Sequence, residues 1–142
     1  MATRPSPDRR PVHPVHGLLL AFPVALFTTA LLSDIAYLNT AEMQWSNFAA
    51  WAITGALLAG APLLLWAALG LWRRRRDPAR RHALAYFLLL LVMWGAGLIN
   101  AFKHSQDAWS SVGTAGVALS IVAAVTALAA GWLGFSGERI AR

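Results

Sequence analysis

Four long apolar segments alternate with short polar segments along this chain of 142 residues. The apolar segments cover about residues 16–38, 45–72, 82–102 and 112–135. A helix that crosses a bilayer needs about 20 apolar residues, and each segment meets that length. Because lipid offers no partner to backbone N–H and C=O groups, a single apolar span satisfies them internally as an α-helix. The pattern predicts an all-α fold, a four-helix transmembrane bundle with up-down topology.

The polar segments between these spans differ in charge, and this difference indicates the orientation. Eleven of the twelve Lys and Arg residues lie before the first span, between the second and third, or after the fourth: Arg4, Arg9, Arg10, Arg73–Arg76, Arg80, Arg81, Arg139 and Arg142. Loops rich in Arg and Lys stay on the cytoplasmic side. We therefore expect both termini in the cytoplasm, with a flexible tail over residues 1–15, the membrane domain over 16–138 and a short tail over 139–142.

Composition narrows the class of protein further. Hydrophobic residues make up 58% of the chain and charged residues 13%, far from the balance of a soluble domain. The net charge of +6 does not indicate nucleic acid, because the basic residues flank spans where anionic lipid headgroups are the expected partner. The chain contains no cysteine, which excludes disulfides, thiolate metal sites and covalent c-type haem. The first segment is too long for a signal peptide, and three further spans follow it.

Polar residues recur at matching places in the first and third spans. His16 and His82 open these spans, and Asp34 and Asn100 lie near their other ends. Within each span the two polar residues are 18 positions apart, which is five helical turns and a rise of about 27 Å. Each pair therefore shares one helix face, and polar groups in a membrane normally face the bundle interior. Because the first and third helices of an up-down bundle lie on a diagonal, we expect the histidines to meet at one end and Asp34 and Asn100 at the other.

Two kinds of site could use the histidines. The first hypothesis is a b-type haem with His16 and His82 as axial ligands and Arg81 as a propionate partner, because haem iron accepts imidazoles from facing helices. The alternative is a metal ion held by His13, His16 and His82, since three imidazoles suit zinc or copper. A flat slot between His16 and His82 would favour haem, whereas a polar cavity from Asp34 to the histidines would favour transport.

Other polar and small residues have simpler interpretations. Asp34 is either a proton carrier or a structural residue that bonds Asn100 or the backbone, and we favour the structural role. His104 and Asp107 fall in the second outer loop, where solvation is enough to explain them. In the fourth span, small residues at fourfold spacing predict close helix packing. They form two stripes, Gly116, Ser120 and Ala124, and Ala123, Ala127 and Gly131.

The start of the chain carries a recognisable pattern, His13-Pro14, His16, Phe22-Pro23 and Asp34. It resembles the domain-of-unknown-function 2231 family of predicted bacterial membrane proteins, over about residues 12–138. Gly17 stands where that family has a second proline. The resemblance implies four spans in a bacterial inner membrane and no established activity. Members that accompany quinoprotein sugar dehydrogenases would favour a redox role.

These observations lead to one preferred function and two alternatives. We expect a small b-type haem electron-transfer or membrane-anchor subunit between a periplasmic dehydrogenase and quinone, without catalytic activity of its own. The alternatives are a cofactor-free structural or transport-related component, and a histidine metal-binding membrane protein. The expected surroundings are the lipid bilayer and other subunits in a homo- or hetero-oligomer.

Overall fold

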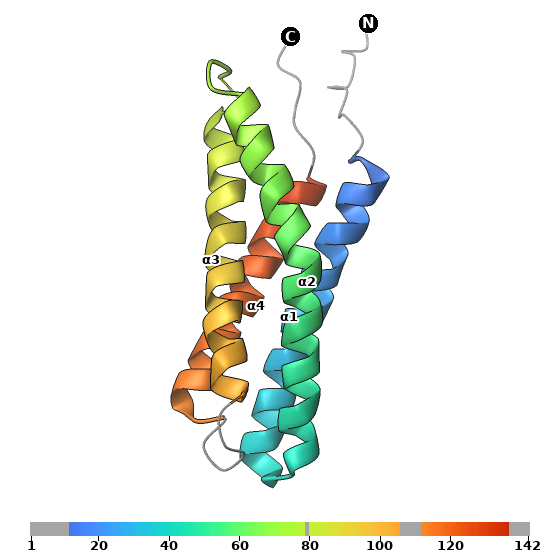
Figure 1. Ribbon diagram of the computed structural model, residues 1–142, viewed down its shortest axis with the longest axis vertical. Helices are drawn as coiled ribbons and strands as arrows, with labels where there is room; N and C mark the ends of the chain where they lie inside the picture. The colour runs from blue at the N-terminus through green and yellow to red at the C-terminus, as the bar shows by residue number, and fades with distance from the viewer. Residues whose placement is uncertain (1–11, 79, 106–111, 137–142) are drawn as a thin grey trace, which may run out of the picture.

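The computed structural model describes residues 12–78, 80–105 and 112–136. Over these ranges the chain forms four α-helices, α1 (Pro14–Thr40), α2 (Met43–Arg73), α3 (Arg80–His104) and α4 (Thr114–Phe135) (Figure 1). All four are long and apolar enough to cross a membrane. The predicted all-α bundle is confirmed, with helix ends within two residues of the predicted ones. The tail residues 1–11 and 137–142 and the outer-loop residue Asp107 lie outside the described residues.

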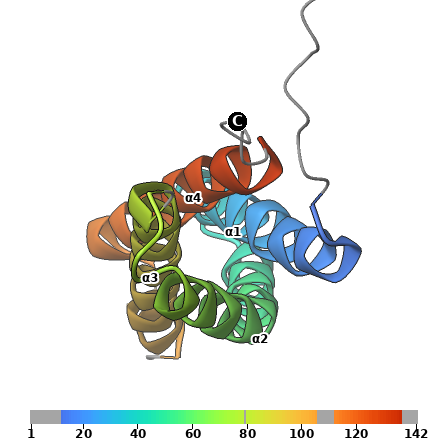
Figure 2. The same ribbon diagram turned by 90° about the horizontal axis from the view of Figure 1, so that it is seen from above.

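The helices run alternately up and down. The starts of α1 and α3 and the ends of α2 and α4 lie together, and we call this end the arginine end because Arg73–Arg76, Arg80 and Arg81 lie there (Figure 1). The other end is called the opposite end. α1 and α3 each pack against α2 and α4. Seen along the bundle, α1 and α3 therefore occupy one diagonal, as predicted (Figure 2).

Small side chains on α4 form its inward face. Seven of them are buried: Gly116, Ser120, Ala123, Ala124, Ala127, Ala130 and Gly131. Lipid tails are as apolar as the helix surfaces, so helices in a membrane associate through close packing, which small residues permit. The two small-residue stripes predicted from the sequence are both buried in the bundle. Large apolar side chains of α4, such as Trp132, instead face outward.

A layer of large apolar side chains fills the middle of the bundle. Its members are fully buried and come from three helices: Leu20, Phe27, Ile53, Leu63, Leu90 and Met93. Pro23 and Pro62 lie inside α1 and α2 without ending either helix. By helix rise, Phe27, Leu90 and Met93 of this layer lie between the His16 end and the Asp34 end of the bundle.

Candidate functional site

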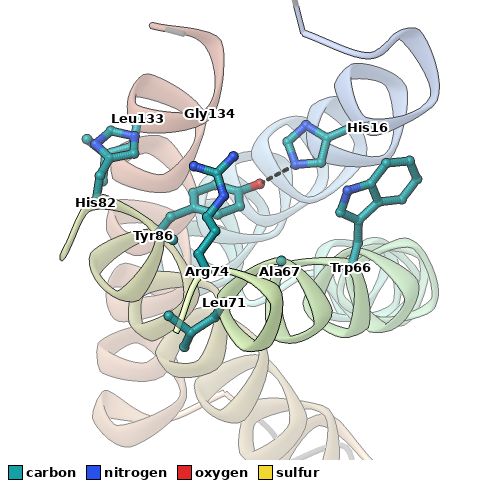
Figure 3. Close-up of a pocket in the computed structure, with 11 residues that line it drawn as sticks. His16, Trp66, Ala67, Leu71, Arg74, His82, Tyr86, Leu133 and Gly134 are labelled. Carbon is teal, nitrogen blue, oxygen red and sulfur yellow. Dashed lines mark hydrogen bonds between the residues drawn. The ribbon is translucent and has the colours of Figure 1, made fainter. Parts of the chain in front are cut away.

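A pocket of about 200 Å³ lies at the arginine end of the bundle. All four helices and the residue after α2 contribute to its lining, which consists of His16, Trp66, Ala67, Gly70, Leu71, Arg74, His82, Ala83, Tyr86, Leu133 and Gly134 (Figure 3). Space for the pocket comes from the small residues Gly70, Ala83 and Gly134. The larger lining residues supply imidazole, phenol, guanidinium and indole groups. The pocket thus combines hydrogen-bonding groups with an aromatic wall.

His16 is held in this pocket by its neighbours. Its Nε2 atom lies 3.0 Å from Tyr86 Oη, and a hydrogen bond joins the two side chains (Figure 3). The ring of His16 also lies against Trp66, with the ring centroids 5.8 Å apart. His13 contacts the same indole at 5.6 Å. The hydrogen bond to the partly buried Tyr86 and the ring contact with Trp66 fix the orientation of His16.

The predicted haem ligands line the same pocket, but their rings do not face each other. Tyr86 and Arg74 lie between His16 and His82 (Figure 3). Arg81, the predicted propionate partner, is exposed and does not line the pocket, whereas Arg74 does. The described residues include no group of three His, Cys, Asp or Glu side chains that could hold a metal ion. His13, His16 and His82 are therefore not gathered into a three-imidazole site.

The opposite end contains a buried polar network that connects three helices. Asp34 of α1 is fully buried, and its Oδ1 atom lies 2.8 Å from His104 Nε2 of α3. Ser120 of α4 donates a hydrogen bond to Asp34 Oδ2. Asn100 Nδ2 donates in turn to Ser120 Oγ at 2.7 Å. Asp34 and Asn100 thus belong to one cluster, in which Ser120 links them.

The prediction for His104 was wrong. The sequence places it in a solvated outer loop, but it is the last residue of α3 and its side chain is 1% exposed. α3 extends a turn's length past Asn100, so His104 falls on the same face as Asn100 and points into the bundle. Its Nδ1 atom lies 3.0 Å from the Asn100 carbonyl oxygen. His104 is therefore a core residue with two hydrogen bonds.

Comparison with known proteins agrees with this architecture. A family model described as "Predicted membrane protein (DUF2231)" matches residues 12–137. The chain belongs to the DUF2231 family. No curated protein and no solved structure matches it.

In this DUF2231 protein, two partners that the sequence analysis missed follow a common rule. His16 bonds Tyr86, and Asp34 bonds His104, and in both pairs the residues are 70 positions apart. The predicted partners, His82 and Asn100, lie one helical turn earlier on the same face of α3. Two parallel helices with the same rise keep one axial offset along their length, so a single shift of a turn explains both differences. The signal available in the sequence was that Tyr86 and His104 are themselves 18 positions apart.

Proposed function

We propose that this protein is a membrane-anchoring component that binds the ring headgroup of a lipid-soluble quinone in the arginine-end pocket. The observation that carries the proposal is the pocket itself. Its volume suits a single ring, and its lining contains several hydrogen-bond donors. A cavity of about 150 Å³ is enough for a benzene molecule, so about 200 Å³ suits a single substituted ring. We further propose that the arginine end is cytoplasmic, in the inner membrane of a bacterium.

The chemistry of the lining supports a neutral ring that carries carbonyl groups. Quinone carbonyl oxygens accept hydrogen bonds, and Tyr86, Arg74 and the two histidines are the potential donors. Trp66 offers a flat apolar face at the side of the pocket, and ring faces stack favourably on indole. Ligand sites of this kind combine an apolar wall with a few polar groups that fix orientation.

A second groove supports a ligand with a lipid tail. It has a volume of about 340 Å³ and runs along α2, lined by Pro62, Leu65, Trp66, Leu69, Gly70 and Arg73. It shares Trp66 and Gly70 with the pocket. Leu65 and Leu69 are exposed on the lipid side of the bundle. A ring in the pocket would therefore have an apolar path beside it for its tail.

The haem hypothesis remains a prediction from the sequence, and the present arrangement of residues does not fit it. A porphyrin contains four rings, whereas the pocket has room for about one. His16 Nε2, the atom that would bind iron, is hydrogen-bonded to Tyr86. Absorption spectroscopy of the purified protein distinguishes the two ligands. The quinone proposal predicts no Soret band, even after haem supplementation, and a band that both His16→Ala and His82→Ala abolish would establish haem instead.

The test of the quinone proposal uses the two tyrosines of the chain as a matched pair. A short-tailed ubiquinone is titrated into the detergent-purified protein and its Kd is measured by calorimetry. Tyr86→Phe removes one hydrogen bond of about 0.5–1.5 kcal/mol, so the Kd should rise roughly two- to tenfold. Tyr37→Phe, at the opposite end, should leave the Kd unchanged.

Two outcomes would contradict the proposal. One is an equal effect of both substitutions, because it would place the quinone elsewhere. The other is the absence of saturable quinone binding together with saturable binding of phosphatidylglycerol, but not phosphatidylcholine, to the pocket. That result would assign Arg74 and the histidines to an anionic lipid headgroup.

A further inference from the structure

The buried network at the opposite end has no role in the proposed quinone site. Asp34, Asn100, His104 and Ser120 lie beyond the apolar layer that contains Phe27, Leu90 and Met93. An acidic residue inside a membrane span is costly to maintain and usually has a function. The hydrogen-bond geometry allows the protons in this network to be counted.

The two ring nitrogens of His104 have different hydrogen-bond partners. Nδ1 lies 3.0 Å from the main-chain carbonyl oxygen of Asn100. A carbonyl oxygen only accepts, so Nδ1 carries a hydrogen and donates it. Nε2 lies 2.8 Å from Asp34 Oδ1. If neither atom carried a hydrogen, two lone pairs would face each other at this distance, and if both did, two hydrogens would collide.

One proton therefore lies between Asp34 Oδ1 and His104 Nε2. The other carboxyl oxygen, Oδ2, accepts from the Ser120 hydroxyl, which in turn accepts from Asn100 Nδ2. Whether the shared proton resides on the imidazole or on the carboxyl group, the pair has no net charge. A neutral pair avoids the several kcal/mol that an uncompensated charge costs in a low-dielectric core.

Asn100 gives an independent indication of a bound molecule. Its side chain is 1% exposed, and among the described residues its Oδ1 atom has no hydrogen-bond partner. Buried polar groups are nearly always paired, and an unpaired one commonly marks a buried water. Asn100 is linked to Asp34 through Ser120, and to His104 through its own main-chain carbonyl oxygen. Its free acceptor therefore belongs to the same cluster.

We propose that Asp34 and His104 form a proton-binding site that holds one shared proton, with a water molecule at Asn100 Oδ1 through which this proton exchanges with solvent. Gain or loss of a proton would leave a net charge in the bundle core. The site thus binds one proton, and its hydrogen bonds connect α1 to α3 and α4.

The experiment counts the protons on the two partners directly. The variant His13→Gln/His16→Gln/His82→Gln leaves His104 as the sole histidine, and the three substitutions all lie at the arginine end. Nitrogen NMR of this variant in detergent at neutral pH reports which ring nitrogens are protonated. Infrared spectroscopy of the wild type reports whether a carboxylic acid band is present that Asp34→Asn removes.

Two results support one shared proton: a doubly protonated ring without the acid band, or a ring protonated only at Nδ1 together with that band. A ring protonated only at Nδ1 without the band, both protonations together, or a ring protonated only at Nε2 would overturn the proposal. In D₂O, deuterium should replace the shared proton, so its NMR or infrared signal should disappear or shift. A signal that persists unchanged would exclude exchange through water. Asp34→Asn separates the two supporting results. It should convert a doubly protonated His104 ring to a neutral ring with its hydrogen on Nδ1, or, where the ring already has its hydrogen only on Nδ1, remove the acid band and leave the ring unchanged.

Discussion

At the scale of single residues, the contact between Gly97 and Phe27 shows how the centre of the bundle is filled. Phe27 of α1 is 1% exposed and reaches across the diagonal to α3. A Cβ atom built on Gly97 would lie 2.5 Å from Phe27 Cζ and 2.7 Å from Cε1. Real Cβ atoms do not approach other atoms so closely, so the missing side chain makes room for the ring. Gly97 is therefore required by packing.

Gly97→Ala should destabilise the bundle by about 1–3 kcal/mol, because an added methyl group in a packed core forces its neighbours to move. Gly95 is the matched control, since it lies in the same helix and a Cβ there would meet nothing within 4 Å. Gly95→Ala should leave the free energy of unfolding unchanged or raise it by up to about 1 kcal/mol through helix propensity. Unfolding in mixed detergent micelles measures both. Equal effects of the two substitutions would show that Phe27 does not occupy this position.

At the scale of helices, the sequence predicted which face of a helix points into the bundle better than it predicted how far one helix is shifted along another. Periodicity placed His16 with Asp34, and His82 with Asn100, on inward faces. In the structure Asp34 and Asn100 are buried, and the partly exposed His16 and His82 line the pocket. Periodicity does not determine how far one helix is shifted along another, because a shift of one turn keeps the same face inward. The partners in α3 were therefore predicted one turn too early. His104 was missed for a related reason, since the length of a helix end depends on tertiary contacts that hydropathy does not report.

The small-residue face of α4 provides a test at this scale. Ala127 is fully buried against the other helices, whereas Ala118 of the same helix is exposed. Ala127→Leu should lower the free energy of unfolding by about 1–3 kcal/mol, because the larger side chain forces α4 away from its neighbours. Ala118→Leu adds the same atoms on the lipid side and should have little effect. Similar losses for both variants, measured in the same micelles, would argue against the observed rotation of α4.

For the whole molecule, hydropathy alone predicted the number of helices, their order and the diagonal placement of α1 and α3. This success follows from the bilayer, which permits few arrangements for four apolar spans. The pocket could not be predicted in the same way, because Trp66 and Arg74 come from α2 and its C-terminal end, far in sequence from His16 and Tyr86. The sequence also predicts which end faces the cytoplasm, and this prediction rests on the distribution of arginines alone.

That orientation can be tested with single cysteines, because the natural chain has none. Pro78 follows the arginines between α2 and α3, and Gln44 lies in the first turn of α2 at the opposite end; both are exposed. In spheroplasts, an impermeant maleimide should label Gln44→Cys at least tenfold faster than Pro78→Cys, and permeabilisation should equalise the rates. Both substitutions replace uncharged residues, so the charge pattern that sets the orientation is unchanged. Replacing Arg73–Arg76 with glutamine in the Pro78→Cys variant should increase labelling from outside, because arginine-rich loops are retained in the cytoplasm and the variant loop would lose that bias. Rapid labelling of Pro78→Cys with the arginines intact would place the arginine-end pocket at the outer surface and the Asp34–His104 pair at the inner one.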